Sequence, residues 1–143
     1  MAPSEALAER ISWLFSSIYF HCHPSFNIEL SHQAVRALQY VHMTGPVTVQ
    51  QVAAHLQCAQ NTASEILQRL QHKGLVCKVR RIDDERVVEV HLTEAGYEAV
   101  RQHTGLDIER LACVLESLQS EQRERIEAGL TLLFNAVRGN KKC

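Results

Sequence analysis

The chain has 143 residues, is 45% hydrophobic and carries a formal net charge of −1. No apolar run approaches the roughly 20 residues of a membrane span, and the N-terminus lacks a signal peptide's basic region and apolar core. The five cysteines are odd in number and never spaced CxxC, which argues against a disulfide framework and a thiolate zinc site. We expect a cytoplasmic protein with reduced thiols, and neither a cofactor nor a metal.

The N-terminal third of the chain predicts two helices. From Ser4 to Cys22, apolar residues recur every three or four positions and form one stripe, and Pro24 ends that helix because it disfavours helical geometry at the preceding residue. Ser31 is a suitable N-cap for a second helix over 32–43, which the Gly45-Pro46 pair ends.

The next segment predicts two short helices joined by a tight turn. Thr48 and Gln51 match a capping box that opens the first of them. The turn covers 57–59, and the second helix covers 60–72. Its apolar residues fall on one face and its polar residues on the other, which a helix that reads the major groove of DNA requires. The inward set is Ala63, Ile66, Leu67 and Leu70.

A β-hairpin is predicted directly after this helix. Gly74 suits the left-handed position that follows a helix, strands are expected over 75–79 and 87–92, and the tip between them is polar. Thr93 then caps another helix. A helix-turn-helix followed by such a wing is typical of DNA-binding proteins. The expected fold is mainly α with a small β-wing.

The C-terminal part predicts further helices with apolar stripes, the last of them capped by Ser120. These helices and the first have no evident partner within one chain, and such stripes usually find a second subunit. We therefore expect one domain over 1–143, in which 1–30 and 94–138 are dimerisation helices, 31–93 is the winged helix-turn-helix and 139–143 is a tail.

Positive charge is concentrated on the predicted DNA-binding segment. From Cys58 to Arg81 there are five basic residues and one acidic residue, whereas from Thr93 to Arg138 there are eight acidic and five basic residues. We expect the C-terminal part to face away from phosphate.

Gln57 to Thr93 resembles the MarR family of bacterial transcriptional regulators, and the resemblance extends over nearly the whole chain. It is carried by the consecutive segments Arg69-Leu70, Lys73-Gly74-Leu75-Val76, Asp84-Glu85-Arg86 and Leu92-Thr93-Glu94-Ala95-Gly96. The resemblance implies a homodimer on a pseudo-palindromic double-stranded DNA operator, with recognition helices in the major groove and wings near the minor groove. It also implies regulation by a small effector, an oxidant or a metal near the junction of the two lobes.

Two positions depart from the family pattern. Ala59 stands where a Ser or Asp often precedes the recognition helix, and Glu65 stands where an Arg is frequent near its middle. Ala59 is a poor cap, which costs ~1 kcal/mol. Glu65 repels phosphate but can accept a hydrogen bond from a cytosine amino group. We therefore expect either a modest affinity for DNA or an affinity that depends unusually strongly on the DNA sequence.

Candidate DNA-binding residues lie on the recognition helix and the wing, although the same residues also suit a solvated helix face and hairpin. Asp84 and Arg86 are expected to form an ion pair that shapes the wing tip. The full set of candidates is Gln60, Asn61, Thr62, Ser64, Gln68, Arg69, Lys73, Lys78, Arg80, Arg81 and Arg86.

Cys22 is a candidate redox or effector residue because His21 and His23 flank it. A reactive cysteine needs a depressed pKa and access to solvent. The alternative is that Cys22 is a buried thiol with a purely structural role. Cys58 and Cys77 are expected to be small core residues. The aromatic residues Trp13, Phe15, Tyr19 and Phe20 suit either an effector pocket or a dimer core.

The sequence is compatible with three functions of a regulatory or binding protein. The leading prediction is a homodimeric repressor that an effector releases from its operator. The alternatives are a winged-helix module for protein contacts, which Glu65 and the near-neutral charge favour, and a thiol- or metal-responsive sensor that uses Cys22. An enzyme is not expected, since no catalytic residues, phosphate loop or strong metal motif are evident.

Overall fold

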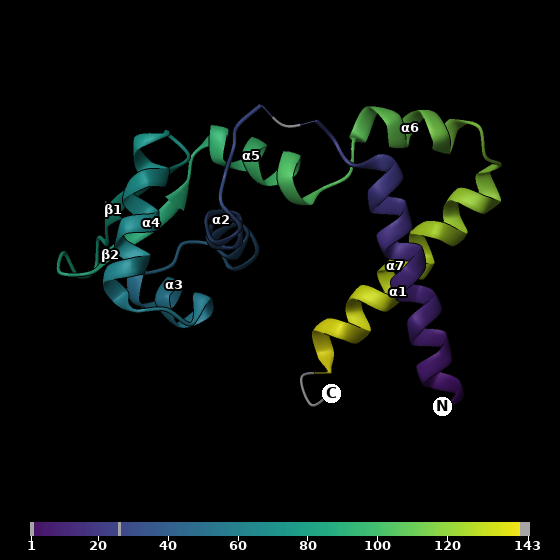
Figure 1. Cartoon of the computed structure of the whole chain (residues 1–143), viewed down its shortest axis with the longest axis horizontal. Coiled ribbons are helices and arrows are strands. Elements are labelled where there is room, and N and C mark those ends of the chain that lie inside the picture. Colours follow the sequence, from purple (N-terminus) through teal and green to yellow (C-terminus); the bar gives the residue numbers. More distant parts are fainter. Residues whose placement is uncertain (1, 26, 141–143) are drawn as a thin grey trace. The chain divides into compact units, whose positions relative to one another are not determined.

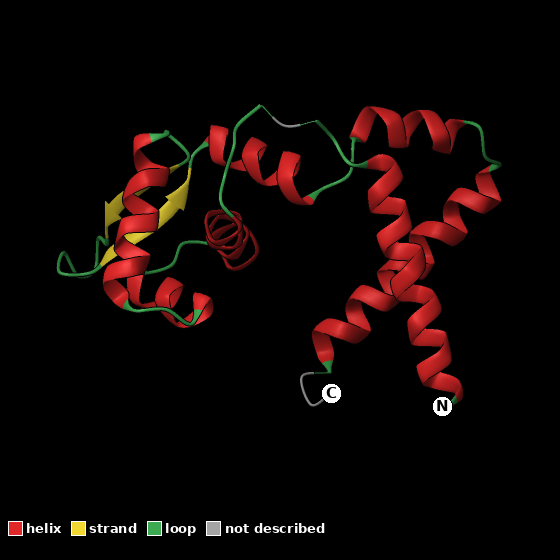
Figure 2. Cartoon of the chain, in the orientation of Figure 1, coloured by secondary structure: helices red, strands yellow, loops and turns green. Residues whose placement is uncertain are grey.

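A computed structural model describes residues 2–25 and 27–140, and its secondary structure is mainly helical with one two-stranded sheet (Figures 1 and 2). Contacts divide the chain into a first unit that ends at Asp107 and a second that begins at Ile108. The elements are α1 (Pro3–Cys22), α2 (His32–Thr44), α3 (Val49–Leu56), α4 (Gln60–His72), β1 (Val76–Arg80), β2 (Val88–Leu92), α5 (Glu94–Thr104), α6 (Ile108–Glu116) and α7 (Ser120–Gly139).

The described helices match the predicted class of fold. Most of the helix and strand boundaries that were predicted from the sequence lie within one residue of those in the structure. None of them is both long and apolar enough to cross a membrane.

Local hydrogen bonds fix the starts of three helices. The hydroxyl oxygens of Ser31, Thr48 and Thr93 each accept a hydrogen bond from the backbone N–H three residues on, at 3.2, 3.2 and 3.1 Å. At α3 the bond is reciprocated, because Gln51 Oε1 accepts from the N–H of Thr48 at 2.8 Å. These are the predicted caps, and they satisfy N–H groups that have no partner inside the helix.

The wing is an antiparallel hairpin in which Val76 lies opposite Leu92 and Arg80 opposite Val88. Strand β2 is joined to the segment before α3 by a short bridge, in which Val90 N donates to Val47 O at 2.7 Å. Gly74 leads into β1 with a φ of 75°, the left-handed conformation predicted for it. The hairpin is therefore anchored at its base and projects at its tip.

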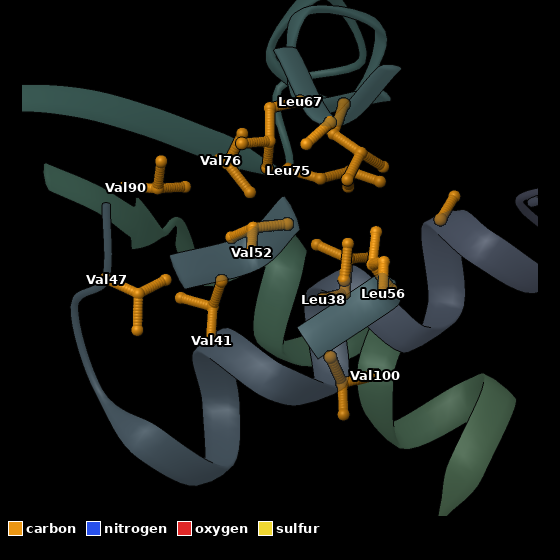
Figure 3. Packing of buried hydrophobic residues seen from close by; sticks show 14 of the residues in the cluster. Leu38, Val41, Val47, Val52, Leu56, Leu67, Leu75, Val76, Val90 and Val100 are labelled. Carbon is orange, nitrogen blue, oxygen red and sulfur yellow. The ribbon is translucent and has the colours of Figure 1, made fainter. Parts of the chain in front are cut away.

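One hydrophobic core joins α2, α3, α4, the hairpin and α5 (Figure 3). Within α4 the buried residues are Ala63, Leu67 and Leu70, while Ile66 is half-buried against the same core. No polar or charged residue is buried among those the structure describes. The side chains that converge in Figure 3 include Leu38, Val41, Val52, Leu56, Leu67, Leu75, Val76, Val90 and Val100.

Three sequence-based predictions are corrected. Cys77 is exposed rather than in the core, because Val76 is the only buried residue of β1 and the rest of that strand is exposed. Ser120 does not cap the last helix but is its first residue, and Gln119 precedes it, its N–H bonded to Gln122 Oε1 at 2.9 Å. The predicted tail begins one residue early, since Gly139 still belongs to α7; its last residues, 141–143 with Cys143, lie outside the described residues.

Gly96 lies where α5 meets the start of the wing. A Cβ atom at this position would overlap the carbonyl oxygen of Leu75, and that same oxygen accepts a hydrogen bond from the N–H of Thr93 at 3.1 Å. The Thr93 hydroxyl also donates to Gly74 O at 2.6 Å. The first turn of α5 is thus held directly against the backbone that enters β1.

We predict that Gly96→Ala lowers the free energy of unfolding by about 1–3 kcal/mol, the usual cost of overpacking. Urea denaturation followed by circular dichroism measures this. Ala95→Ser, at an exposed position in the same turn, serves as the control and should change stability by less than ~0.5 kcal/mol. Equal stability of the two variants would contradict the close approach.

Candidate nucleic-acid interface

The face of α4 opposite the core is polar and exposed. Gln60, Asn61, Thr62, Gln68 and Arg69 are exposed, and Ser64 is half-buried. Their side chains form no hydrogen bond with any other described residue, so their donors and acceptors are available to a ligand. The buried residues of the same helix fix the orientation of this face.

The first turn of α4 is capped by no side chain. Ala59 occupies the N-cap position and offers no oxygen to the N–H groups that follow. Those N–H groups remain available to an anion or a water molecule, and the partial positive charge of a helix N-terminus adds to their attraction. Glu65 is exposed on the same helix, one turn further on.

Arg81 is engaged on both sides within the wing. Its guanidinium donates to Asp83 through two hydrogen bonds of 2.9 and 2.5 Å and lies 3.3 Å from a Glu89 oxygen. The hydrogen bond to Asp83 raises the pKa of Arg81 and lowers the pKa of Asp83. At neutral pH both groups are charged and paired, so Arg81 offers DNA less free charge than an isolated arginine.

The predicted ion pair between Asp84 and Arg86 is present. Arg86 Nε lies 3.0 Å from Asp84 Oδ1, and the backbone N–H of Arg86 donates to the same oxygen at 3.1 Å. These hydrogen bonds hold the pKa of the Asp84 carboxyl below its ordinary value. The Arg86 side chain nevertheless remains 91% exposed, so it can both hold the tip and reach a ligand.

The remaining basic candidates differ in whether their side chains are hydrogen-bonded within the chain. Lys73 Nζ donates to the carbonyl oxygen of Glu29 at 3.1 Å, and Arg80 Nη1 donates to that of Glu85 at 2.9 Å. Lys78 is exposed on β1. Between Arg80 and Arg86 the tip carries three basic and three acidic side chains, so its formal charges cancel.

Cys22 itself has little access to solvent, although the flanking His21 and His23 are exposed. Cys22 is buried, and its Sγ lies 3.7 Å from the carbonyl oxygen of Asp107. Within residues 2–25 and 27–140, no group of three or more His, Cys, Asp or Glu side chains is arranged to hold a metal ion. Trp13, Phe15 and Phe20 are exposed on α1. Burial of Cys22 favours the structural explanation over the redox one, because a reactive thiol needs access.

Comparisons with known proteins show which family and which fold this chain resembles. A family model described as transcriptional regulator SarA/Rot matches residues 27–103. YfiV of Bacillus subtilis, an uncharacterized HTH-type transcriptional regulator, is 25% identical over 115 residues, 80% of this chain and 72% of that protein. A MarR-like regulator from Thermotoga maritima has a TM-score of 0.63 at 22% identity, covering 96% of this chain and 98% of that one. FabT of Streptococcus pneumoniae, solved in complex with DNA, has a TM-score of 0.59 at 22% identity, covering 95% and 98%.

The exposed polar helix and the hairpin beside it define a winged helix-turn-helix protein with the MarR-type fold. Because the matched residues make up more than half of the chain, the chain belongs to the SarA/Rot family of transcriptional regulators. It regulates transcription and is not an enzyme. The resemblance to MarR regulators inferred from the recognition helix and wing is confirmed.

We predict that Arg86→Ala raises the pKa of the Asp84 carboxyl toward its ordinary value, because the hydrogen bond from the Arg86 side chain, which contributes most to lowering that pKa, is lost. An NMR pH titration of the carboxyl carbon measures this. Since the folded-state pKa is lowered, the pair is fully formed above the ordinary aspartate pKa and is lost as pH falls through the folded value. Lys78→Ala, which removes a charge without touching Asp84, should leave the titration unchanged.

Proposed function

We propose that this regulator is a homodimeric repressor that binds a pseudo-palindromic duplex, with α4 of each protomer in the major groove and the wing beside it. The observation that carries the proposal is the division of α4 into an apolar face packed against the core and a largely exposed polar face whose side chains have no hydrogen-bond partner among the described residues. A helix so held can offer side chains to base edges without losing its own packing.

The polar residues of α4 suit base recognition at its N-terminal end. Gln60 and Asn61 carry amides, which pair with the N6 and N7 positions of adenine, and Thr62 and Ser64 carry hydroxyls, which suit phosphates or bases. Arg69 and Lys78 supply positive charge to the flanking phosphates. The candidate residues named from the sequence therefore remain the proposed DNA contacts.

Glu65 makes the proposed recognition selective. A carboxylate on the exposed face repels phosphate wherever no donor meets it, but it accepts a hydrogen bond from the N4 amino group of cytosine. A duplex with cytosine at that place is favoured, and other duplexes are penalised. The formal net charge of −1 acts in the same direction, because it weakens sequence-independent attraction.

Exposed apolar residues on the helices outside the winged unit support the proposed dimer. On α1 they include Leu14 and Phe15, and on α7 they include Leu130, Leu133 and Phe134. Side chains of this size exposed in stripes are characteristic of surfaces that a second subunit covers. Two-fold symmetry then presents two α4 helices to successive major grooves, about 34 Å apart.

Release by a small effector follows from the MarR resemblance and stays a prediction. An effector must bind the free and DNA-bound conformations with different affinities, and this difference sets how far the regulator's affinity for DNA falls. The second candidate function is a winged-helix module for protein contact. Glu65 and the cancelled charges of the wing tip favour it, and a regulator that selects no DNA sequence would support it.

We predict that the full-length chain enriches a two-fold symmetric sequence from a random duplex library, and that Gln60→Ala weakens binding to the selected duplex about tenfold. Gln71→Ala, the same change at the opposite end of α4, is the matched control and should have little effect. With about four phosphates neutralised per protomer, a plot of the logarithm of the binding constant against the logarithm of the salt concentration has a slope of roughly −7. Binding without salt dependence would contradict the proposal.

We predict that sedimentation equilibrium finds a dimer at micromolar concentration, and that Leu133→Glu shifts it to monomer because a charge then enters the apolar stripe of α7. Asn135→Glu introduces the same charge about 160° around the helix and should leave the dimer intact. Circular dichroism checks that both variants keep their helix content. A wild-type chain that sediments as a monomer would overturn the dimer.

A further inference from the structure

The tip of the wing presents one apolar side chain entirely to solvent. Ile82 lies between β1 and β2, and its relative accessibility is 103%, so the rest of the chain covers none of it. Elsewhere in the hairpin, Val76 and Val90 are buried, and Val79 is 46% exposed. An isoleucine fully exposed at the end of a projecting loop contributes nothing to the core.

The tip is held by hydrogen bonds on both sides of Ile82. The N–H of Arg81 donates to Val87 O at 2.9 Å, and the N–H of Val87 donates to Asp84 O at 3.0 Å. The side-chain pair of Asp84 and Arg86 and the bond from Arg80 to Glu85 O close the same loop. These bonds restrict the loop that carries Ile82, which lowers the conformational entropy lost when the loop meets a partner.

The charges around Ile82 limit what the tip can do by electrostatics. Its three arginines are matched by three acidic residues, and the guanidiniums of Arg81 and Arg86 are bonded to Asp83 and Asp84. Pairing with aspartate lowers the free positive charge that Arg81 and Arg86 offer to a narrow minor groove, although the Arg86 side chain remains exposed. This tip also carries an uncharged, fully exposed hydrocarbon side chain, that of Ile82.

We propose that Ile82 is an apolar wedge that enters the minor groove of the bound duplex and partly unstacks a pyrimidine–purine step beside each half-site. The inference rests on the proposed DNA-binding function. Apolar side chains inserted between base steps kink DNA, and TA and CA steps unstack most easily. Ile82 would thus add sequence preference at a position where no hydrogen bond is made to a base.

A groove in DNA fits this feature better than a protein surface does. Apolar patches that bind proteins extend over a few hundred Å². Here one side chain stands alone, with charged residues on both sides of it. A single isoleucine is too small for such a patch but is sufficient to separate one base step.

The test compares the full-length chain with Ile82→Ala, Ile82→Leu and Val79→Ala. Each protein selects sequences from a random duplex library, and each is titrated against the duplex that the wild type selects. A second copy of that duplex carries 2-aminopurine at the step nearest the wing, because its fluorescence rises when the base unstacks. Thermal denaturation of the four proteins confirms that Ile82→Ala, at a fully exposed position, leaves stability unchanged.

We expect Ile82→Ala to bind the selected duplex about tenfold more weakly with an unchanged salt slope, since no phosphate contact is lost. It should lose the preference for a pyrimidine–purine step while keeping the half-site preference, and it should give no 2-aminopurine signal. Ile82→Leu should retain most of each effect, and Val79→Ala should behave like the wild type.

Two results would overturn the inference, and they differ in what they say of the proposed function. If Ile82→Ala matches the wild type in affinity, flanking preference and 2-aminopurine signal, the wedge is wrong while DNA recognition by α4 stands. If the wild type itself enriches no duplex sequence, the proposed DNA-binding function fails, and the wedge fails with it.

Discussion

Burial of one face of α4 is the constraint on which the rest of this structure depends. Ala63, Leu67 and Leu70 are almost completely removed from solvent, and they fix how the helix is rotated about its own axis. A small rotation would move apolar atoms into water and polar side chains such as Asn61 into the core, at a cost of about 25 cal/mol per Å² of apolar surface exposed. The polar face of α4 points outward because the apolar face of the same helix is buried in the core.

The hairpin joins this core by the buried side chains of Val76 and Val90 and also by backbone contacts. Val90 pairs with Val47 ahead of α3, and the carbonyl groups of Gly74 and Leu75 accept hydrogen bonds from Thr93 at the start of α5. The base of the wing is therefore as firmly placed as the helices. Its tip lies beyond the core, and local ion pairs organise it instead.

Local signals in the sequence predicted most of the winged unit. Helix caps depend on residues three positions apart, so Ser31, Thr48 and Thr93 are recognisable without any knowledge of the fold. The spacing of apolar residues revealed which face of α4 is buried. The predicted ion pair at Asp84 was equally local. Cys77 was misplaced because an apolar residue within a strand was assigned to the core, whereas β1 leaves the core directly after Val76 and its remaining residues are exposed.

The sequence by itself determined the order of elements, the caps and the two-sided character of α4, because each follows from interactions within about four residues. Only the tertiary structure decided which side chains are free. It buried Cys22, paired Arg81 with Asp83 and Glu89, and left Ile82 wholly exposed. Cys22 is buried near Asp107, 85 residues away, and Arg81 meets Glu89 on the other strand, so a window of about four residues does not contain this information.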